Sequence, residues 1–303
     1  MGGASRKLRQ AVAKFVCWMA NTHPPWAAYR VLIWNRLVAL GKNSGIRPIV
    51  IGEIWRRLLA KYILAITCPS AKDAYGLDQL CAGLSTGIEG AIHGMSQLWE
   101  ESEALDYWGF LLVDARNAFN KLNRINMLWT IRHEWPAGAR FTLNCYCHHG
   151  TLLCSAPDGT SFKIPSRAGI TRCDLLVMLI YDGGLMPMVR QLKEVHPHAV
   201  QPWYADDAGS ADHFDEIEAF FKDLAKIGPD FGYFPGPSKG ILIVRSRNLQ
   251  SGRLFFNEQR RRGFQIIMGF VGKMEKRDEW LSSRLLYFEH MARQNFDRVF
   301  GDV

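Results

Sequence analysis

The chain has 303 residues, with 37 Lys and Arg against 29 Asp and Glu, and 48% of its residues are hydrophobic. A chain of this length buries roughly three quarters of its unfolded surface, enough for one large domain or two smaller ones. Ordinary contents of charged residues, Gly and Pro exclude collagen and argue against disorder or low complexity. Because no run of about 18 uncharged apolar residues occurs, we expect no membrane-spanning helix and no membrane partner.

The net charge of +8 is concentrated at the N-terminal end. Eight basic residues and no acidic one lie between Met1 and Gly52, whereas the rest of the chain carries 29 residues of each sign. This asymmetry indicates an anionic partner near the N-terminus, although a solvated basic face explains it equally well. The segment has no secretory apolar core, and its basic character continues past the length of a typical mitochondrial presequence.

Seven sparsely placed cysteines are typical of reduced intracellular thiols. We therefore expect an intracellular protein, either nuclear or cytoplasmic. Residues 145–149, with Cys154, carry the atoms that zinc needs, but their spacing matches no common zinc finger. Core cysteines are the simpler interpretation.

In chain order, the first half of the sequence predicts helices around short strands. Apolar residues at helical spacing predict helices over residues 6–20, 55–67, 77–100 and 117–135, with breaks at Pro24-Pro25 and at Cys68-Pro69. Residues 41–48 read as a basic turn before the short apolar run 49–51. Residues 107–113 are strand-like and lead into Asp114.

The second half alternates short strands with helices. Residues 151–155 and 161–164 flank Pro157-Asp158-Gly159, which is typical of a hairpin turn. The pattern further predicts a helix over 174–189 interrupted at Gly183-Gly184 and Pro187, strands over 201–205 and 208–211, an amphipathic helix over 214–227, and strands over 241–244 and 265–271. This order suits an α+β fold in which helices cover one face of an antiparallel sheet.

Three aspartates stand at the ends of predicted strands. Asp114 ends one strand, and Asp206-Asp207 lie at the tip of a short hairpin. If the two strands lie side by side, Asp114 comes close to Asp206. Converging carboxylates need a cation, and oxygen ligands favour two Mg²⁺ or Mn²⁺ ions, which can activate a 3′-hydroxyl and stabilise a leaving pyrophosphate. Taken alone, an Asp-Asp pair is more often an ordinary turn.

Several segments together resemble the reverse transcriptases. Tyr204-Ala205-Asp206-Asp207 resembles the third palm motif of that family, and residues 111–120 resemble the first. Residues 41–61 are similar to the fingers segment, Gly169-Ile170-Thr171 with Asp174 to the second palm motif, residues 233–239 to the fourth and residues 269–272 to the fifth. The motifs occur in family order over roughly residues 30 to 280. They are most similar to retrotransposon enzymes without long terminal repeats.

The resemblance implies a right-hand polymerase fragment of fingers and palm, with an antiparallel, ferredoxin-like palm sheet backed by helices. It implies a basic N-terminal extension at 1–29, fingers at 30–106, a palm at 107–272 with an inserted fingers hairpin at about 136–168, and the start of a thumb at 273–303. The thumb is therefore expected to be absent or truncated. Further domains of a larger polyprotein are expected to be missing.

The resemblance also implies roles for individual residues. Asp114, Asp206, Asp207 and the carbonyl of Ala115 would bind the two Mg²⁺ or Mn²⁺ ions. Lys42 and Arg47 would grip the triphosphate of a dNTP, Gly169 would lie against that nucleotide, and Phe119 would stand at the sugar gate and exclude a ribose 2′-hydroxyl. Lys239 would protonate the pyrophosphate, and Gly269 and Gly272 would hold the primer end.

Each of these roles has a plainer alternative. Surface charges explain Lys42 and Arg47, and a solvated lysine beside a turn explains Lys239. Ordinary core packing at the start of a helix explains Phe119. These alternatives stay open at the level of sequence.

The implied activity is that of an RNA-directed DNA polymerase, which uses an RNA template and a DNA primer. The second palm motif, however, carries Arg172, Cys173 and Leu175 where the family has Gln, Gly and Pro. A side chain in place of that Gly obstructs the approach of the backbone to nucleotide and template. The alternative is therefore a catalytically silent retroelement remnant that at most binds nucleic acid. A viral RNA-dependent RNA polymerase is disfavoured by Tyr204-Ala205 and by Phe119.

Overall fold

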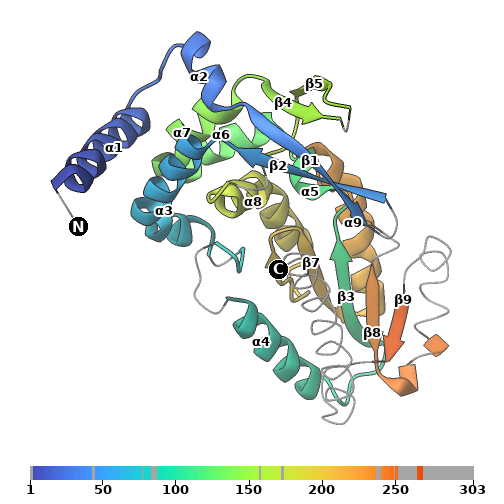
Figure 1. Cartoon of the computed structure of the whole chain (residues 1–303). Coiled ribbons are helices and arrows are strands. Elements are labelled where there is room, and N and C mark those ends of the chain that lie inside the picture. Colours follow the sequence, from blue (N-terminus) through green and yellow to red (C-terminus); the bar gives the residue numbers. More distant parts are fainter. Residues whose placement is uncertain are drawn as a thin grey trace, which may run out of the picture.

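A computed structural model describes residues 3–42, 45–76, 78–82, 87–156, 158–171, 174–236, 240–248, 250–251 and 265–268. Two sheets and the helices around them build an α+β fold (Figure 1). Within these ranges, no helix combines the length and apolar character needed to cross a bilayer.

The N-terminal half builds a four-stranded sheet with helices beside it. Helices α1 (Gly3–Asn21) and α2 (Trp26–Leu32) precede the hairpin of β1 (Asn35–Lys42) and β2 (Gly45–Gly52). Strands β4 (Gly150–Ser155) and β5 (Ser161–Ser166) complete the order β2-β1-β4-β5, in which β1 and β4 run parallel. The helix expected over 6–20 and the hairpin around Gly159 are confirmed. Most of the expected basic turn at 41–48 lies in the two strands instead.

Helix α3 (Ile54–Tyr75) runs through Pro69, so the helix end expected at Cys68-Pro69 is wrong. A proline inside a helix removes one backbone hydrogen bond. Two hydroxyls satisfy carbonyls around this point: Thr67 Oγ1 donates to the carbonyl of Ile63, and Ser70 Oγ donates to that of Thr67, each at 2.8 Å. Helix α4 (Gly87–Glu101) occupies only the second part of the helix expected over 77–100.

The second sheet has five strands in the order β6-β7-β3-β8-β9. They are β3 (Trp108–Asp114), β6 (Trp203–Tyr204), β7 (Asp207–His213), β8 (Ile241–Val244) and β9 (Gln265–Met268). Strands β6, β7, β3 and β8 are antiparallel, as expected, but β9 runs parallel to β8. Parallel neighbours need a crossover of about a dozen residues, and residues 245–264 supply that length. A short 3-10 turn, η2 (Ser246–Asn248), follows β8.

Both faces of this sheet are covered, whereas helices were expected on one face only. Alternate side chains of β3 point to opposite faces. Leu111 and Val113 join the main core with α8 (Val177–Val195) and α9 (Phe214–Phe231). On the other face, the ring of Trp99 from α4 lies 5.8 Å from that of Phe110.

Two helix predictions between residues 117 and 189 are wrong. The helix expected over 117–135 divides into α5 (Ala118–Lys121) and α6 (Arg124–Glu134), because Asn123 accepts from the amides of Ile125 and Asn126 and caps α6; α7 (Pro136–Tyr146) follows. Helix α8 continues through Gly183-Gly184 and Pro187. A Cβ on Gly183 would lie 2.8 Å from Tyr75 Oη, so this glycine allows close packing instead of ending the helix.

Two glycines with positive φ provide a matched test of the fold. A Cβ on Gly169 (φ +69°) would lie 2.3 Å from the carbonyl carbon of Asn120, whereas Gly159 (φ +84°) has no atom within 4 Å of such a Cβ. We expect Gly159→Ala to cost about 1 kcal/mol of unfolding free energy from backbone strain. Gly169→Ala should cost about 1–3 kcal/mol more because of overpacking. Urea unfolding measures both, and equal costs would contradict the close approach at Gly169.

Candidate functional site

The predicted carboxylates lie at one end of the five-stranded sheet. Asp114, the last residue of β3, is the register partner of Asp207, the first residue of β7. Cα atoms of such antiparallel partners are about 4.5–5.5 Å apart. Asp206 lies in the turn that joins β6 to β7. From the sequence we expect Asp114 to lie close to Asp206. In the structure, the residue directly opposite Asp114 in the sheet is Asp207.

A buried tyrosine, Tyr233, supports the turn that carries Asp206. Burial raises the pKa of Tyr233 well above its ordinary value, and the charges of Asp206, Asp207 and Asp114 raise it further. The phenol therefore stays neutral and can donate a hydrogen bond. Its Oη donates to the backbone carbonyl of Asp206 at 3.0 Å. Tyr233 thus supports the turn from inside the protein, and the charges of all three aspartates act on its phenol.

The segment that follows Tyr233 runs beside the end of β3. The amide of Gly236 donates to the carbonyl of Asp114, and the amide of Arg116 donates to the carbonyl of Phe234, each at 2.8 Å. Ala115, the predicted carbonyl ligand, is buried between these two bonds. Residues similar to the fourth palm motif therefore lie directly against the first.

Phe119 occupies the first turn of α5, close behind Asp114. Its ring is 8% exposed and its centroid lies 4.5 Å from that of Tyr181. Burial raises the pKa of Tyr181 well above its ordinary value, and the nearby Tyr233, Asp206 and Asp207 add to the effect. Phe119 therefore stands between the helix core and the carboxylate end of the sheet. Its role as a sugar gate stays a prediction.

Gly169 contacts the backbone of the Phe119 segment. The amide of Ile170 donates to the carbonyl of Phe119 at 2.7 Å, and that of Gly169 donates to the carbonyl of Leu122 at 3.0 Å. Arg124 fixes the same strand-to-loop segment by donating to the carbonyl of Gly169 at 2.8 Å. The structure thus joins Gly169 to Phe119.

A buried ion pair anchors the rest of this segment to α3. Arg56 Nε donates to Asp174 Oδ2 at 2.9 Å, and both side chains are almost fully buried. Arg56 Nη2 also donates to Tyr146 Oη, which accepts from the amide of Thr171 at 3.1 Å. Removing one partner of such a pair leaves an uncompensated buried charge. Sequence reasoning placed Arg56 and Asp174 in separate motifs and did not pair them.

The remaining predicted residues are described in part or not at all. Lys42 pairs with Gly45, and Arg47 pairs with Leu40, so both belong to the end of the β1–β2 hairpin where the two strands connect. Lys239, Gly269 and Gly272 lie outside the described residues, as do Arg172 and Cys173 of the altered second motif.

No three His, Cys, Asp or Glu side chains in the described ranges are arranged to hold a metal ion. This finding argues against zinc at residues 145–149, where Cys145 is instead buried 3.7 Å from Tyr29 Oη. The aspartates share one end of the sheet without forming a closed ligand set. Their oxygen-only donors nevertheless match the ligands that Mg²⁺ and Mn²⁺ prefer.

A second polar pair lies directly behind the Ala205 turn. Asp182, on α8, is fully buried, and the Cys81 thiol donates to both of its carboxylate oxygens at 3.1 Å. Burial raises the pKa of Asp182 to about 8, although the thiol hydrogen bond opposes this shift. Cys81 Sγ in turn accepts from the amide of Ala205 at 3.2 Å. Sequence reasoning missed both residues, because nothing in the pattern distinguishes an aspartate inside an apolar helix from a surface one.

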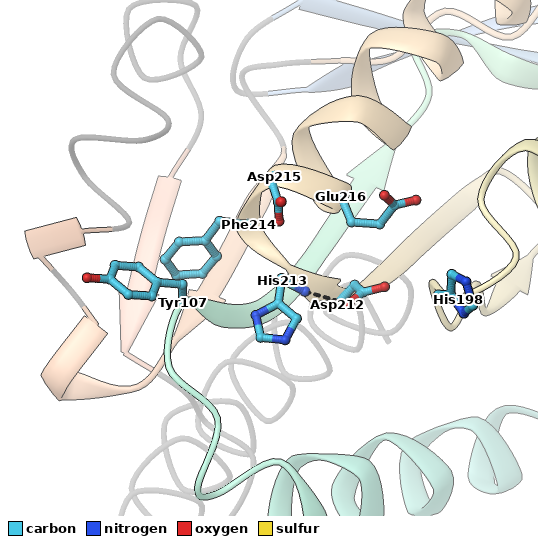
Figure 2. Close-up of a pocket in the computed structure, with 7 residues that line it drawn as sticks. All are labelled: Tyr107, His198, Asp212, His213, Phe214, Asp215 and Glu216. Atoms are coloured by element: carbon cyan, nitrogen blue, oxygen red, sulfur yellow. Dashed lines mark hydrogen bonds between the residues drawn. The ribbon is translucent and has the colours of Figure 1, made fainter.

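A separate hollow lies at the far end of β7, about 20 Å along the strand from Asp207. Figure 2 shows this open pocket of about 530 Å³, with Asp212, Asp215 and Glu216 beside two histidines, His198 and His213. It contains none of the predicted site residues. The candidate site is therefore the carboxylate end of the sheet and not this pocket.

The raised pKa of Asp182 predicts a specific dependence of stability on pH. Between about pH 4 and pH 8 the unfolded chain has lost this proton while the folded protein retains it, so stability falls as pH rises across that window. Asp182→Asn keeps an acceptor for Cys81 but cannot ionise. Between pH 5 and pH 7 the free energy of unfolding of the variant should therefore rise by about 2–3 kcal/mol relative to that of the wild type, at roughly 1.4 kcal/mol per pH unit.

Urea unfolding of both proteins at the two pH values measures this difference. Asp215→Asn, at an exposed position, serves as the control and should follow the wild-type profile. Parallel profiles for Asp182→Asn and the wild type would contradict a protonated buried carboxyl.

The fold of this chain is similar to that of solved telomerase structures. No family model and no curated protein sequence matches the chain. A structure of telomerase from Candida albicans in complex with a TWJ fragment of telomeric RNA matches 78% of this chain and 47% of its own, with a TM-score of 0.56 and 11% identity. Apo telomerase from Candida tropicalis, truncated from its C-terminal domain, matches 70% of this chain and 50% of its own, with a TM-score of 0.54 and 10% identity.

The chain thus spans about half the length of these telomerase structures. At 10–11% identity the likeness concerns the fold. The chain has a telomerase-like α+β fold, and its predicted carboxylates stand together at one end of the larger sheet.

Proposed function

We propose that this chain is a reverse transcriptase-like polymerase domain of a retroelement, which transfers deoxynucleotides to a primer 3′-hydroxyl on an RNA template. The observation that carries this proposal is the pairing of Asp114 with Asp207 at the strand ends, with Asp206 in the adjoining turn. Three carboxylates from two strand ends make a strongly negative site. Such a site attracts cations and repels phosphates unless cations are bound as well. The telomerase-like fold supports a polymerase-related enzyme.

The residues proposed to hold two Mg²⁺ or Mn²⁺ ions are Asp114, Asp206, Asp207 and the carbonyl of Ala115. When bound, such ions lower the charge repulsion between attacking and leaving oxygens during nucleotidyl transfer. The chain itself contributes the rigid register of β3 and β7 and the neutral phenol of Tyr233 beneath the turn. Both favour a fixed spacing of the carboxylates.

The proposed nucleotide side of the site includes Lys42, Arg47, Phe119 and Gly169, with Lys239 as the acid for pyrophosphate. Gly269 and Gly272 are proposed to hold the primer. We assign residues 30–106 and the insertion at about 136–168 to fingers and residues 107–272 to a palm. Support for this division comes from the shared sheet of β1–β2 and β4–β5, separate from the sheet that carries the aspartates.

A catalytically silent remnant that binds nucleic acid is the second candidate. Two observations favour it: the replacement of Gln, Gly and Pro by Arg172, Cys173 and Leu175, and the lack of a closed metal-ligand set among the described residues. Leu175 is itself 45% exposed, which indicates that the altered motif faces solvent at this position.

Primer extension on an RNA template distinguishes the two candidates. We expect incorporation of dNTPs with Mg²⁺ or Mn²⁺, and Asp206→Asn should reduce it by more than the 10–100-fold typical of residues that only orient metal ligands. Asp212→Asn, near the far end of the strand that follows Asp206, is the matched control and should retain activity. If the wild type is inactive and the triple change Arg172→Gln/Cys173→Gly/Leu175→Pro restores incorporation, the remnant is the correct assignment.

The sugar gate predicts a change in nucleotide choice. Because a smaller side chain leaves room for a 2′-hydroxyl, Phe119→Val should reduce the preference for dNTP over rNTP by roughly tenfold or more. The ratio of the two rates within each variant is the measurement, since loss of folded protein affects both rates equally. Equal use of ribonucleotides and deoxynucleotides by the wild type would exclude the gate and favour an RNA polymerase.

A further inference from the structure

A short segment before α4 connects α8 to the turn that carries the aspartates. At one end of this segment, Asp78 forms ion pairs with Arg190 at 3.2 Å and Lys193 at 2.9 Å, both on α8. Two residues later, the amide of Leu80 donates to the carbonyl of Trp203 in β6 at 2.9 Å. Residues 78–82 therefore hold β6 at a fixed place relative to the long central helix.

Between these anchors, Gln79 contacts both polar groups of one peptide residue. Its Oε1 accepts from the amide of Ala205 at 3.1 Å, and its Nε2 donates to the carbonyl of Ala205 at 3.4 Å. The Gln79 side chain is fully buried. A carboxamide offers an acceptor and a donor on two separate atoms, so it satisfies both groups without a charge.

The backbone of Ala205 needs such support. Its φ is +52°, in the left-handed region that side chains other than glycine seldom adopt. A residue held there costs of order 1–3 kcal/mol and persists when its surroundings impose the conformation. Ala205 is also 3% exposed, so water cannot replace lost partners for its amide and carbonyl.

The direction of Asp206 and Asp207 depends on this turn. Adjacent side chains in extended backbone point to opposite sides, and the left-handed residue before them changes that direction. Cys81 Sγ provides a second acceptor for the Ala205 amide, but a thiol sulfur is a weak one. Gln79 is the group that bonds both the amide and the carbonyl.

We infer that Gln79 is a positioning residue for the carboxylate turn: it imposes the left-handed conformation of Ala205 and thereby directs Asp206 and Asp207 toward Asp114. The catalytic part of this inference rests on the proposed function. The conformational part does not, since it concerns only the hydrogen bonds of one buried turn. Sequence reasoning missed Gln79 because a glutamine between helices is usually a surface residue.

The test uses an isosteric change and a matched control. Gln79→Met retains the volume of the side chain and removes both hydrogen bonds. Gln201→Met removes two hydrogen bonds from another buried glutamine, whose Nε2 donates to the carbonyls of Leu192 and His196, both at 3.1 Å. Both changes therefore have a similar chemical cost, but only the first acts on Ala205.

Amide hydrogen exchange of Ala205 is the first readout, measured by NMR in the full chain labelled with ¹⁵N-alanine. Loss of two hydrogen bonds should accelerate exchange at Ala205 at least about tenfold in Gln79→Met, with little change in Gln201→Met. Equal acceleration in both variants, or none in Gln79→Met, would overturn the inference. This readout requires no catalytic activity, so it stands even if the chain is an inactive remnant.

Primer extension provides the second readout. Misdirected carboxylates should lower kcat at least about tenfold in Gln79→Met with the KM for dNTP unchanged, because the nucleotide contacts proposed for Lys42 and Arg47 are not altered. Gln79→Glu, which keeps the acceptor for the Ala205 amide, should recover part of that loss. A change confined to KM, or full activity with fast Ala205 exchange, would overturn the catalytic part of the inference, that Gln79 directs the carboxylates.

Discussion

The register between β3 and β7 is the constraint on which the candidate site depends. Side chains alternate between the two faces of a strand, so a slip of one residue would reverse every side chain and separate Asp114 from Asp207. Burial on both faces opposes such a slip, since Val113 joins the main core and Phe110 packs on Trp99. Gly109 adds a steric reason: a Cβ there would lie 2.7 Å from the carbonyl oxygen of Ile243.

The protein supports this strand end with buried polar groups instead of apolar packing alone. Gln79, Cys81 and Asp182 lie behind the Ala205 turn, and Tyr233 lies under it. Buried polar groups lower stability unless they are paired, but a satisfied network specifies one geometry where apolar contacts permit several. The carboxyl of Asp182, whose pKa is raised to about 8 by burial, lowers the stability of the fold at neutral pH. Asp182 lies next to the Ala205 turn, so this loss of stability is associated with the candidate site and not with the general core.

Local pattern predicted β3, β7, β8 and the amphipathic helix α9 well, because each is determined by which face of an element is buried, but it predicted no strand at β1 and a turn over the first half of β2. The helix ends were harder. Pro69 and Gly183 read as breaks, yet α3 runs through the proline, and Tyr75 occupies the space beside the glycine in α8. Such continuations depend on tertiary packing that single-residue propensities do not contain.

The candidate site likewise contains residues that can be predicted from strand ends and residues whose role depends on a tertiary contact. Asp114, Asp206 and Asp207 were found because strand ends and hairpin tips are visible in sequence. Gln79 and Asp182 were not, since each acts through a residue more than twenty positions away. Identity of 10–11% with telomerase structures is compatible with this division, because alternating burial maintains a sheet register through many substitutions. Side chains that hydrogen-bond to the backbone of a turn cannot be exchanged so freely, because a replacement loses those bonds. Substitutions behind Ala205 are therefore the ones expected to disturb the candidate site first.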